Sequence, residues 1–248
     1  MNSIASKYAA GDYDLVFAIA TPMAQSIAQN VVDTPVLFTA VTDPVAAELV
    51  ESNEAPGYNV TGTTDMNPVA KQIDLVKQVI PDAHKVGIIY SSGEVNSQVQ
   101  VKLAKAEAKK QGLEVVEKTI TNTAEVQQAA QTLTGVDAIF IPTDNTVVAA
   151  LDSVLQVAEE KGILTVAGES SSVNDGAALT LGLDYKTLGH QTGEMAVKIL
   201  KGEAKPEAMP VEAQKTPLLV INPEAAKKQG HPIPAELMDC LLYTSDAA

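Results

Sequence analysis

The stretch KVGIIYSSGEVNSQVQVKLAKAEAKKQ, residues 85–111, decides the fold expected for this chain. A short apolar run at residues 86–90 gives way to small polar residues at 91–97, and apolar side chains then recur at helical spacing. The pattern predicts a strand, a polar loop and a helix. The loop places polar side chains beside the first turn of that helix, where free backbone N–H groups and the helix dipole favour an anion such as a carboxylate.

The same alternation recurs along the chain. Further strands are predicted at residues 15–20, 35–41, 59–63, 113–120, 138–142, 163–167, 177–183 and 217–221. The helices predicted between them, including 45–51 and 146–161, imply right-handed βαβ crossovers and parallel sheets covered on both faces. About nine strands are more than one compact sheet of this length usually needs. We therefore expect an α/β fold with two doubly wound parallel-sheet lobes.

Composition narrows the classes of partner. The 248 residues carry 17 basic and 31 acidic side chains, a net charge of −14, which argues against nucleic acid and anionic membrane surfaces. No run of residues is apolar over the length of a membrane span, and the first residues lack the pattern of an export signal. The sequence as written predicts a soluble chain. Its single cysteine, Cys240, cannot form an internal disulfide.

Polar side chains gather where the predicted strands end. Ligands of open α/β sheets bind outside the carboxyl ends of the strands. The candidate ligand-binding residues are Thr21, Thr42, Asp65, Tyr90, Ser92, Asn96, Ser97, Thr143, Asp144, Asn145, Glu169, Asp184 and Tyr185. Hydroxyls, carboxylates and two aromatic rings suit a small zwitterion. The alternative for any single position is that the side chain only caps a helix.

The usual signatures of enzymes are missing from the sequence. No strand is followed by G-x-G-x-x-G or by a phosphate-binding loop, and residues 168–172 lack the second glycine of a nucleophile elbow. His84, His190 and His231 stand far apart, without other metal-ligating residues at suitable spacing. We expect no catalytic residue, no metal and no cofactor.

Several runs strongly resemble the substrate-binding proteins of ABC importers. They are FAIATPMAQ (17–25), LFTAVTDPVAAELV (37–50), NVTGTTDM (59–66), VGIIYSSGEVNSQVQ (86–100), EVQQAAQTL (125–133), IPTDNTVV (141–148), LGLDYKTLGHQTGEMAVKILKGE (181–203) and LVIN (219–222). The nearest group is associated with tryptophan and tyrosine uptake and has the type I periplasmic-binding-protein fold. The resemblance covers about residues 3–237.

The resemblance implies two lobes joined by a hinge, with an amino acid, tryptophan or tyrosine above all, clamped between them. Crossovers are expected near residues 63–65, 183–185 and 203–206. Lobe one would hold residues 1–63 plus 186–203, and lobe two residues 64–185 plus 204–237. Ser92, Asn96 and Ser97 with Thr42 would bind the carboxylate of the ligand, Asp144 and Asp184 its ammonium group, and Tyr90 and Tyr185 would form aromatic walls.

The chain departs from the family pattern at both ends. Family members usually begin with an export signal, often a lipoprotein signal, and with a strand, a helix and a second strand that have no counterpart here. Lobe one is therefore expected to be incomplete, and the chain to fold poorly or bind weakly, because a missing central strand leaves edges unpaired. Residues 238–248 do not resemble the family's closing helix and are expected to be an unrelated tail.

The resemblance implies an extracytoplasmic protein that delivers its ligand to a membrane permease and touches the membrane only through a lipid anchor upstream of this chain. One alternative is the effector-sensing domain of a transcription regulator with the same two-lobe fold, which a helix-turn-helix encoded upstream would indicate. Another is an enzyme such as a racemase. Loss of turnover when Asp144 is changed would indicate such an enzyme. Which amino acid is bound and the oligomeric state are left open by the sequence.

Overall fold

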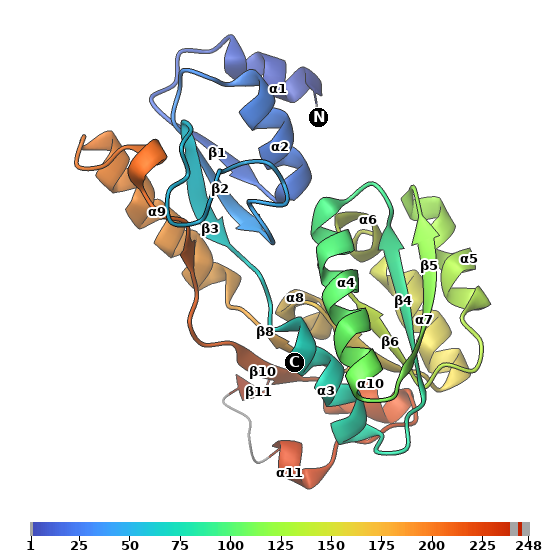
Figure 1. Ribbon diagram of the computed structural model, residues 1–248. Helices are drawn as coiled ribbons and strands as arrows, with labels where there is room; N and C mark the ends of the chain where they lie inside the picture. Colours follow the sequence, from blue (N-terminus) through green and yellow to red (C-terminus); the bar gives the residue numbers. More distant parts are fainter. Residues whose placement is uncertain (1, 239–242, 245–248) are drawn as a thin grey trace. The chain divides into compact units, whose positions relative to one another are not determined.

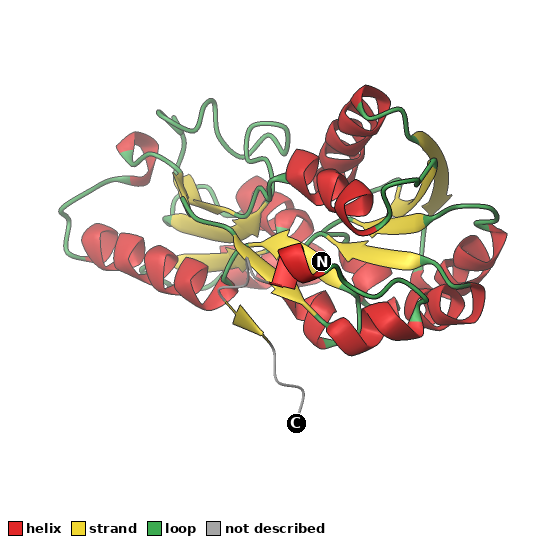
Figure 2. Ribbon diagram, turned by 90° about the horizontal axis from the view of Figure 1, so that it is seen from below, coloured by secondary structure: helices red, strands yellow, loops and turns green. Residues whose placement is uncertain are grey.

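The computed structural model describes residues 2–238 and 243–244 of the chain, which divides into two compact units (Figure 1). Unit 1 comprises Met1–Met66 and Leu183–Thr216, and unit 2 comprises Asn67–Gly182 and Pro217–Ala248. Each unit has its own sheet, with helices beside the strands (Figure 2). The predicted α/β class with two sheets is confirmed.

Unit 1 is built on a four-stranded sheet in the order β1-β2-β3-β9, and all its strand pairs are parallel. The strands are β1 (Val16–Ile19), β2 (Val36–Val41), β3 (Val60–Thr64) and β9 (Glu212–Ala213). The helices are α1 (Asn2–Ala9), α2 (Thr21–Asn30), α9 (Tyr185–Leu200) and the short 3-10 helix η2 (Pro206–Ala208).

Strand alternation explains how unit 1 is covered. Phe38 points to the face on which Ala24 and Ile27 of α2 pack, together with Ala5 of α1. Its neighbour Leu37 points to the opposite face and contacts Met195 of α9. Successive side chains of a strand lie on opposite faces, so an apolar strand such as β2 buries both.

The outermost strand β1 leaves part of its apolar surface uncovered. Phe17 and Ile19 are 51% and 65% exposed, and β1 stands at one end of the described strand order. An apolar end strand offers backbone groups for pairing with another chain. We expect Ile19→Lys to lower the rate of aggregation several-fold, while changing the free energy of unfolding by less than about 0.5 kcal/mol. Light scattering at rising protein concentration measures the first quantity, and urea denaturation the second.

The control is Leu103→Lys, which adds the same charge at an exposed apolar residue of a helix in unit 2. This variant is expected to aggregate like the unmodified chain. Equal protection by both substitutions would mean that net charge, and not the edge of β1, governs association.

Unit 2 contains a seven-stranded sheet in the order β11-β10-β8-β7-β6-β4-β5. Its strands are β4 (Lys85–Ser91), β5 (Glu114–Ile120), β6 (Ala138–Ile141), β7 (Leu164–Ala167), β8 (Leu179–Gly182), β10 (Leu218–Ile221) and β11 (Tyr243–Thr244). Its helices are α3 (Val69–Val79), α4 (Val95–Lys110), η1 (Thr123–Glu125), α5 (Val126–Thr132), α6 (Asn145–Val148), α7 (Leu151–Lys161), α8 (Ser170–Asn174), α10 (Pro223–Lys228) and α11 (Ala235–Met238).

Two hydrophobic clusters cover the two faces of this sheet. Ile88 and Phe140 pack with α3 and α4 on one face, whereas Ile89 and Ile139 pack with α5 and α7 on the other. Because β4 and β6 are buried on both faces, their sequences are continuous apolar runs. In residues 85–111, this apolar run therefore located β4 correctly, and the helical spacing after it located α4.

Several sequence expectations were wrong in detail. The strand β10 runs antiparallel to β8, because the chain between them passes through unit 1 instead of making a βαβ crossover. Residues 204–216 belong to unit 1, since the short strand β9 pairs with β3. The chain thus passes between the units after Met66, Gly182 and Thr216. Of the expected tail 238–248, residues 239–242 and 245–248 lie outside the described part.

Two predicted helices also differ. Residues 45–51 form no helix, and residues 44–48 are a turn, because Glu48 has a left-handed backbone with φ of 59° that a right-handed helix cannot continue. The helix predicted at 146–161 is broken into α6 and α7, with Ala150 between them at φ of −126° and ψ of 31°. The apolar spacing runs through this break, so periodicity alone could not reveal it.

Candidate functional site

Three of the predicted residues in unit 1 meet at the carboxyl ends of its strands. The Thr42 hydroxyl donates to Asp65 Oδ1 at 3.2 Å, and the Tyr185 hydroxyl donates to Asp65 Oδ2 at 2.7 Å. Thr42 follows β2, Asp65 follows β3, and Tyr185 opens α9. Thr42 and Asp65 are both buried. The structure therefore brings these side chains together, while their contact with a ligand stays a prediction.

Thr21 occupies the first position of α2 at the same edge of the sheet. Its side chain is 2% exposed, and its hydroxyl has no hydrogen-bond partner among the described residues. The preceding residue Ala20 gives the helix no side-chain cap, and a helix N-terminus leaves backbone N–H groups without intrahelical partners. A buried hydroxyl without a partner beside such N–H groups suits an acceptor such as a carboxylate.

Two alanines beside these threonines have strained backbones. Ala20 and Ala40 have φ of 69° and 56°, in the left-handed region that residues with a Cβ avoid. Ala40 lies at an irregularity in the pairing of β2 with β3. Strain of this kind persists where the surrounding structure enforces it, and it concentrates at binding sites.

In unit 2, Asp144 is completely buried and ties β4 to the loop after β6. Its Oδ2 accepts hydrogen bonds of 2.6 Å from the Ser91 backbone N–H and from the Ser97 hydroxyl. Its Oδ1 accepts from the backbone N–H groups of Thr146 and Val147 at 3.0 and 2.8 Å. Burial raises the pKa of Asp144 and the negative charge of Glu94 adds to this, while the hydrogen bonds from Ser97, Ser91 and Val147 oppose it.

Glu94, which the sequence-based list omitted, lies at the centre of the same network. Its Oε1 accepts from the backbone N–H and hydroxyl of Thr146, and its Oε2 accepts from Asn96 Nδ2 and from the backbone and side-chain nitrogens of Asn145. Burial alone would raise the pKa of Glu94, but the hydrogen bonds from Asn145, Asn96 and Thr146 outweigh it and hold that pKa below its ordinary value.

Asn96 and Thr143 complete this cluster. Asn96 Nδ2 donates to the carbonyl of Thr143 at 2.8 Å, and the Asn96 Oδ1 is buried without a partner in the described part of the chain. Gln100, a second residue that the sequence did not single out, accepts from the Thr143 backbone N–H at 3.1 Å and donates to its hydroxyl. The structure thus unites Asn96, Ser97, Thr143, Asp144 and Asn145.

The remaining predicted residues lie outside the two clusters and serve locally. Glu169 caps α8, and Asp184 caps α9. The Thr187 hydroxyl and the backbone N–H groups of the first turn lower the pKa of Asp184. Ser92 is exposed, and its backbone N–H donates to Ile120 O. Glu169 and Asp184 thus have the capping role given above as the alternative to ligand binding, whereas Ser92 caps no helix among the described residues.

Tyr90 lies apart from both clusters as well. Its hydroxyl donates to Glu117 Oε2 at 3.3 Å, on the neighbouring strand β5. Burial and the Glu117 carboxylate raise the pKa of Tyr90. For Tyr90, as for Ser92, Glu169 and Asp184, ligand contact stays a prediction.

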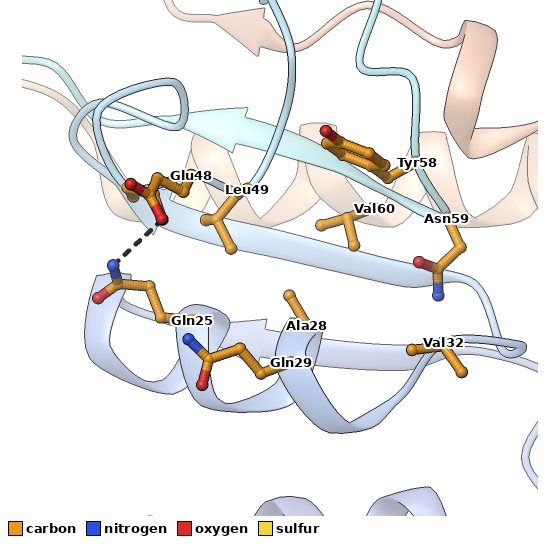
Figure 3. Close-up of a pocket in the computed structure, with 10 residues that line it drawn as sticks. Gln25, Ala28, Gln29, Val32, Glu48, Leu49, Tyr58, Asn59 and Val60 are labelled. Carbon is orange, nitrogen blue, oxygen red and sulfur yellow. Dashed lines mark hydrogen bonds between the residues drawn. The ribbon is translucent and has the colours of Figure 1, made fainter.

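A pocket of about 510 Å³ lies elsewhere in unit 1, beside α2 (Figure 3). It is lined by Gln25, Ala28, Gln29, Val32, Ala47, Glu48, Leu49, Tyr58, Asn59 and Val60. Gln25 Nε2 donates to Ala47 O at 3.1 Å across one end of it. None of the predicted site residues lines this pocket.

Among the described residues, no group of three or more His, Cys, Asp or Glu side chains could hold a metal ion. The described helices also include none with the length and apolar character needed to cross a membrane.

Residues 1–240 match the family model described as "ABC transporter substrate binding protein". The chain belongs to this family. The tyrosine-binding protein of Clostridioides difficile strain R20291 is 43% identical to it over 226 residues, which make up 91% of this chain and 65% of that relative. The chain thus spans about two thirds of the length of the curated relatives it matches.

Solved structures agree with the family. The ABC domain of a Streptococcus pneumoniae protein in complex with L-Trp has a TM-score of 0.93 and 35% identity, covering 98% of this chain and 84% of that one. A conserved domain protein of Vibrio cholerae has a TM-score of 0.95 and 36% identity, covering 98% and 82%. The resemblance read from the sequence and the type I periplasmic-binding-protein fold are confirmed.

Proposed function

We propose that this protein binds an amino acid with an aromatic side chain, tryptophan or tyrosine, as the substrate-binding component of an ABC importer. The observation that carries the proposal is its likeness, over 98% of its length, to the S. pneumoniae domain crystallised with L-Trp. The name of the C. difficile relative adds support, since it is called a tyrosine-binding protein.

The geometry of unit 1 supports an amino acid in particular. The unpartnered Thr21 hydroxyl and the first turn of α2 would bind the α-carboxylate, because hydroxyl and backbone N–H groups donate to it together. Asp65 is buried and accepts from Thr42 and Tyr185, so it would favour the ammonium group through its negative charge and not by direct contact. The Tyr185 ring next to it would contact the side chain of the ligand. Contacts from the second unit remain a prediction from the sequence.

The family also supports proposals about location and partners. We propose that the protein works outside the cytoplasmic membrane and delivers its ligand to the permease of the importer. Its contact with the membrane would be through a lipid anchor.

Isothermal titration of the chain with each of the twenty amino acids tests the proposed ligand. We expect L-Trp or L-Tyr to bind most tightly, and acidic and basic amino acids to bind at least about 100-fold more weakly. The C. difficile relative, titrated with L-Tyr in parallel, is the positive control. The proposal is wrong if the relative binds and this chain, shown to be folded by hydrogen exchange, binds no aromatic amino acid.

A further inference from the structure

Two neighbouring loops of unit 2 are fastened by a pair of buried carboxylates. β4 and β6 are adjacent in the sheet, so the loops that follow them leave the same edge side by side. Glu94 belongs to the first loop and Asp144 to the second. Each carboxylate accepts hydrogen bonds from the other side: Glu94 from Asn145 and Thr146, and Asp144 from Ser91 and Ser97.

One backbone N–H joins the two carboxylates directly. The Thr146 N–H donates to Glu94 Oε1 and to Asp144 Oδ1, both at 3.0 Å. Neither carboxylate forms an ion pair with a described lysine or histidine. Two like charges placed this close repel each other, so the arrangement depends on the polar hydrogens that both loops direct at it.

Neither carboxylate has a surface left for a ligand. Asp144 is 0% and Glu94 is 6% exposed, and all four of their oxygens already accept hydrogen bonds. Glu94 occupies the position that should cap its own helix α4, yet it makes no cap there. Its carboxylate instead holds the start of α6, across the gap between the loops.

We propose that Glu94 and Asp144 are positioning residues for amino-acid binding, which lock the loops after β4 and β6 into one rigid edge. This inference rests on the proposed function, and it gives Asp144 a role different from direct contact with the ammonium group. Glu94 would support binding by holding the two loops in place, without touching the ligand. If the loops are already held in place before binding, less conformational entropy is lost when the ligand binds, and the affinity is higher.

The variant Glu94→Gln tests the proposal. A glutamine amide keeps one acceptor oxygen and replaces the other with an NH2 group, which would face the N–H donors of either Asn145 or Thr146. We expect amide hydrogen exchange at Asn145, Thr146 and Val147 to become at least about tenfold faster, and the affinity for L-Trp or L-Tyr to fall by about tenfold. Glu159→Gln, at an exposed position of α7, is the matched control and should change neither quantity.

The titration of Asp144 tests whether the two carboxylates act as a pair. With Glu94 replaced by glutamine, the like charge is gone, so the pKa of Asp144 should fall relative to the unmodified chain. Carboxyl carbon NMR without ligand measures this pKa. An unchanged pKa of Asp144 in Glu94→Gln would show that the two groups do not act as a pair and would overturn the proposal.

The other outcomes separate this proposal from the proposed function. Faster exchange with unchanged affinity would make the pair purely structural, and lower affinity with unchanged exchange would make Glu94 a direct ligand contact; either result overturns the proposal. If the unmodified chain binds no amino acid, the proposed function fails by itself, because exchange and titration are measured without ligand.

Discussion

Replacing Gly62 with alanine is expected to lower the free energy of unfolding by about 3 kcal/mol or more. Gly62 lies in β3, where a Cβ atom would stand 1.9 Å from Phe38 O and less than 3.0 Å from two further backbone atoms of Phe38. Backbone in the middle of a buried strand cannot move aside, so the pairing of β2 with β3 must open. Urea denaturation, with hydrogen exchange followed separately in each unit, measures the effect.

Gly189→Ala is the control with the opposite expected sign. Gly189 lies within α9 of the same unit, and a Cβ there would meet no atom within 4 Å apart from its own helix and its chain neighbours. Alanine should stabilise the helix by about 0.5–1 kcal/mol, because glycine loses more backbone entropy on folding. The account of Gly62 fails if Gly62→Ala is as stable as the unmodified chain to within about 1 kcal/mol.

Replacing Thr21 with valine is expected to weaken binding of L-Trp or L-Tyr at least about tenfold without lowering stability. Valine keeps the shape of the side chain and removes only the hydroxyl. Because that buried hydroxyl has no described partner, its loss should leave the free energy of unfolding unchanged or raised by less than about 1 kcal/mol. Titration calorimetry and urea denaturation of the same preparation test both parts.

The matched control is Thr61→Val, at a fully buried position of β3. The Thr61 hydroxyl donates to Met209 O at 2.7 Å, so its removal leaves a carbonyl without this donor. This variant should lose about 1–2 kcal/mol of stability and keep its affinity within about twofold. If Thr21→Val behaves like Thr61→Val, the Thr21 hydroxyl serves the fold and not the ligand.

The strands and most helices of this protein are readable from its sequence because their signals are local. Residues 86–90 are continuously apolar because β4 is buried on both faces, and the polar run after them marks the loop. Strand β9 escaped prediction because two residues carry no periodicity. Strand β10 was predicted at residues 217–221, but its antiparallel direction was not, because strand direction depends on where the chain returns, which no local pattern records.

The candidate site was also predictable only in part. Sequence alone placed hydroxyls, amides and acids at the carboxyl ends of the strands, since this follows from the alternation of strands and helices. It could not tell Thr21, with an unused buried hydroxyl, from Asp184, which caps its own helix. That distinction depends on the partners each side chain finds in space.

Glu94 shows this limit most clearly. In the sequence it is an acidic residue at the start of α4, where capping its own helix is the natural prediction. In the folded chain its carboxylate reaches Asn145 and Thr146, which lie 51 and 52 positions along the chain. The pattern of apolar and polar residues thus decided the strands, the helices and the edge where the polar groups collect. Only tertiary packing decided which of those groups hold the loops and which remain for a ligand, because a hydrogen bond depends on distance in space and not along the chain.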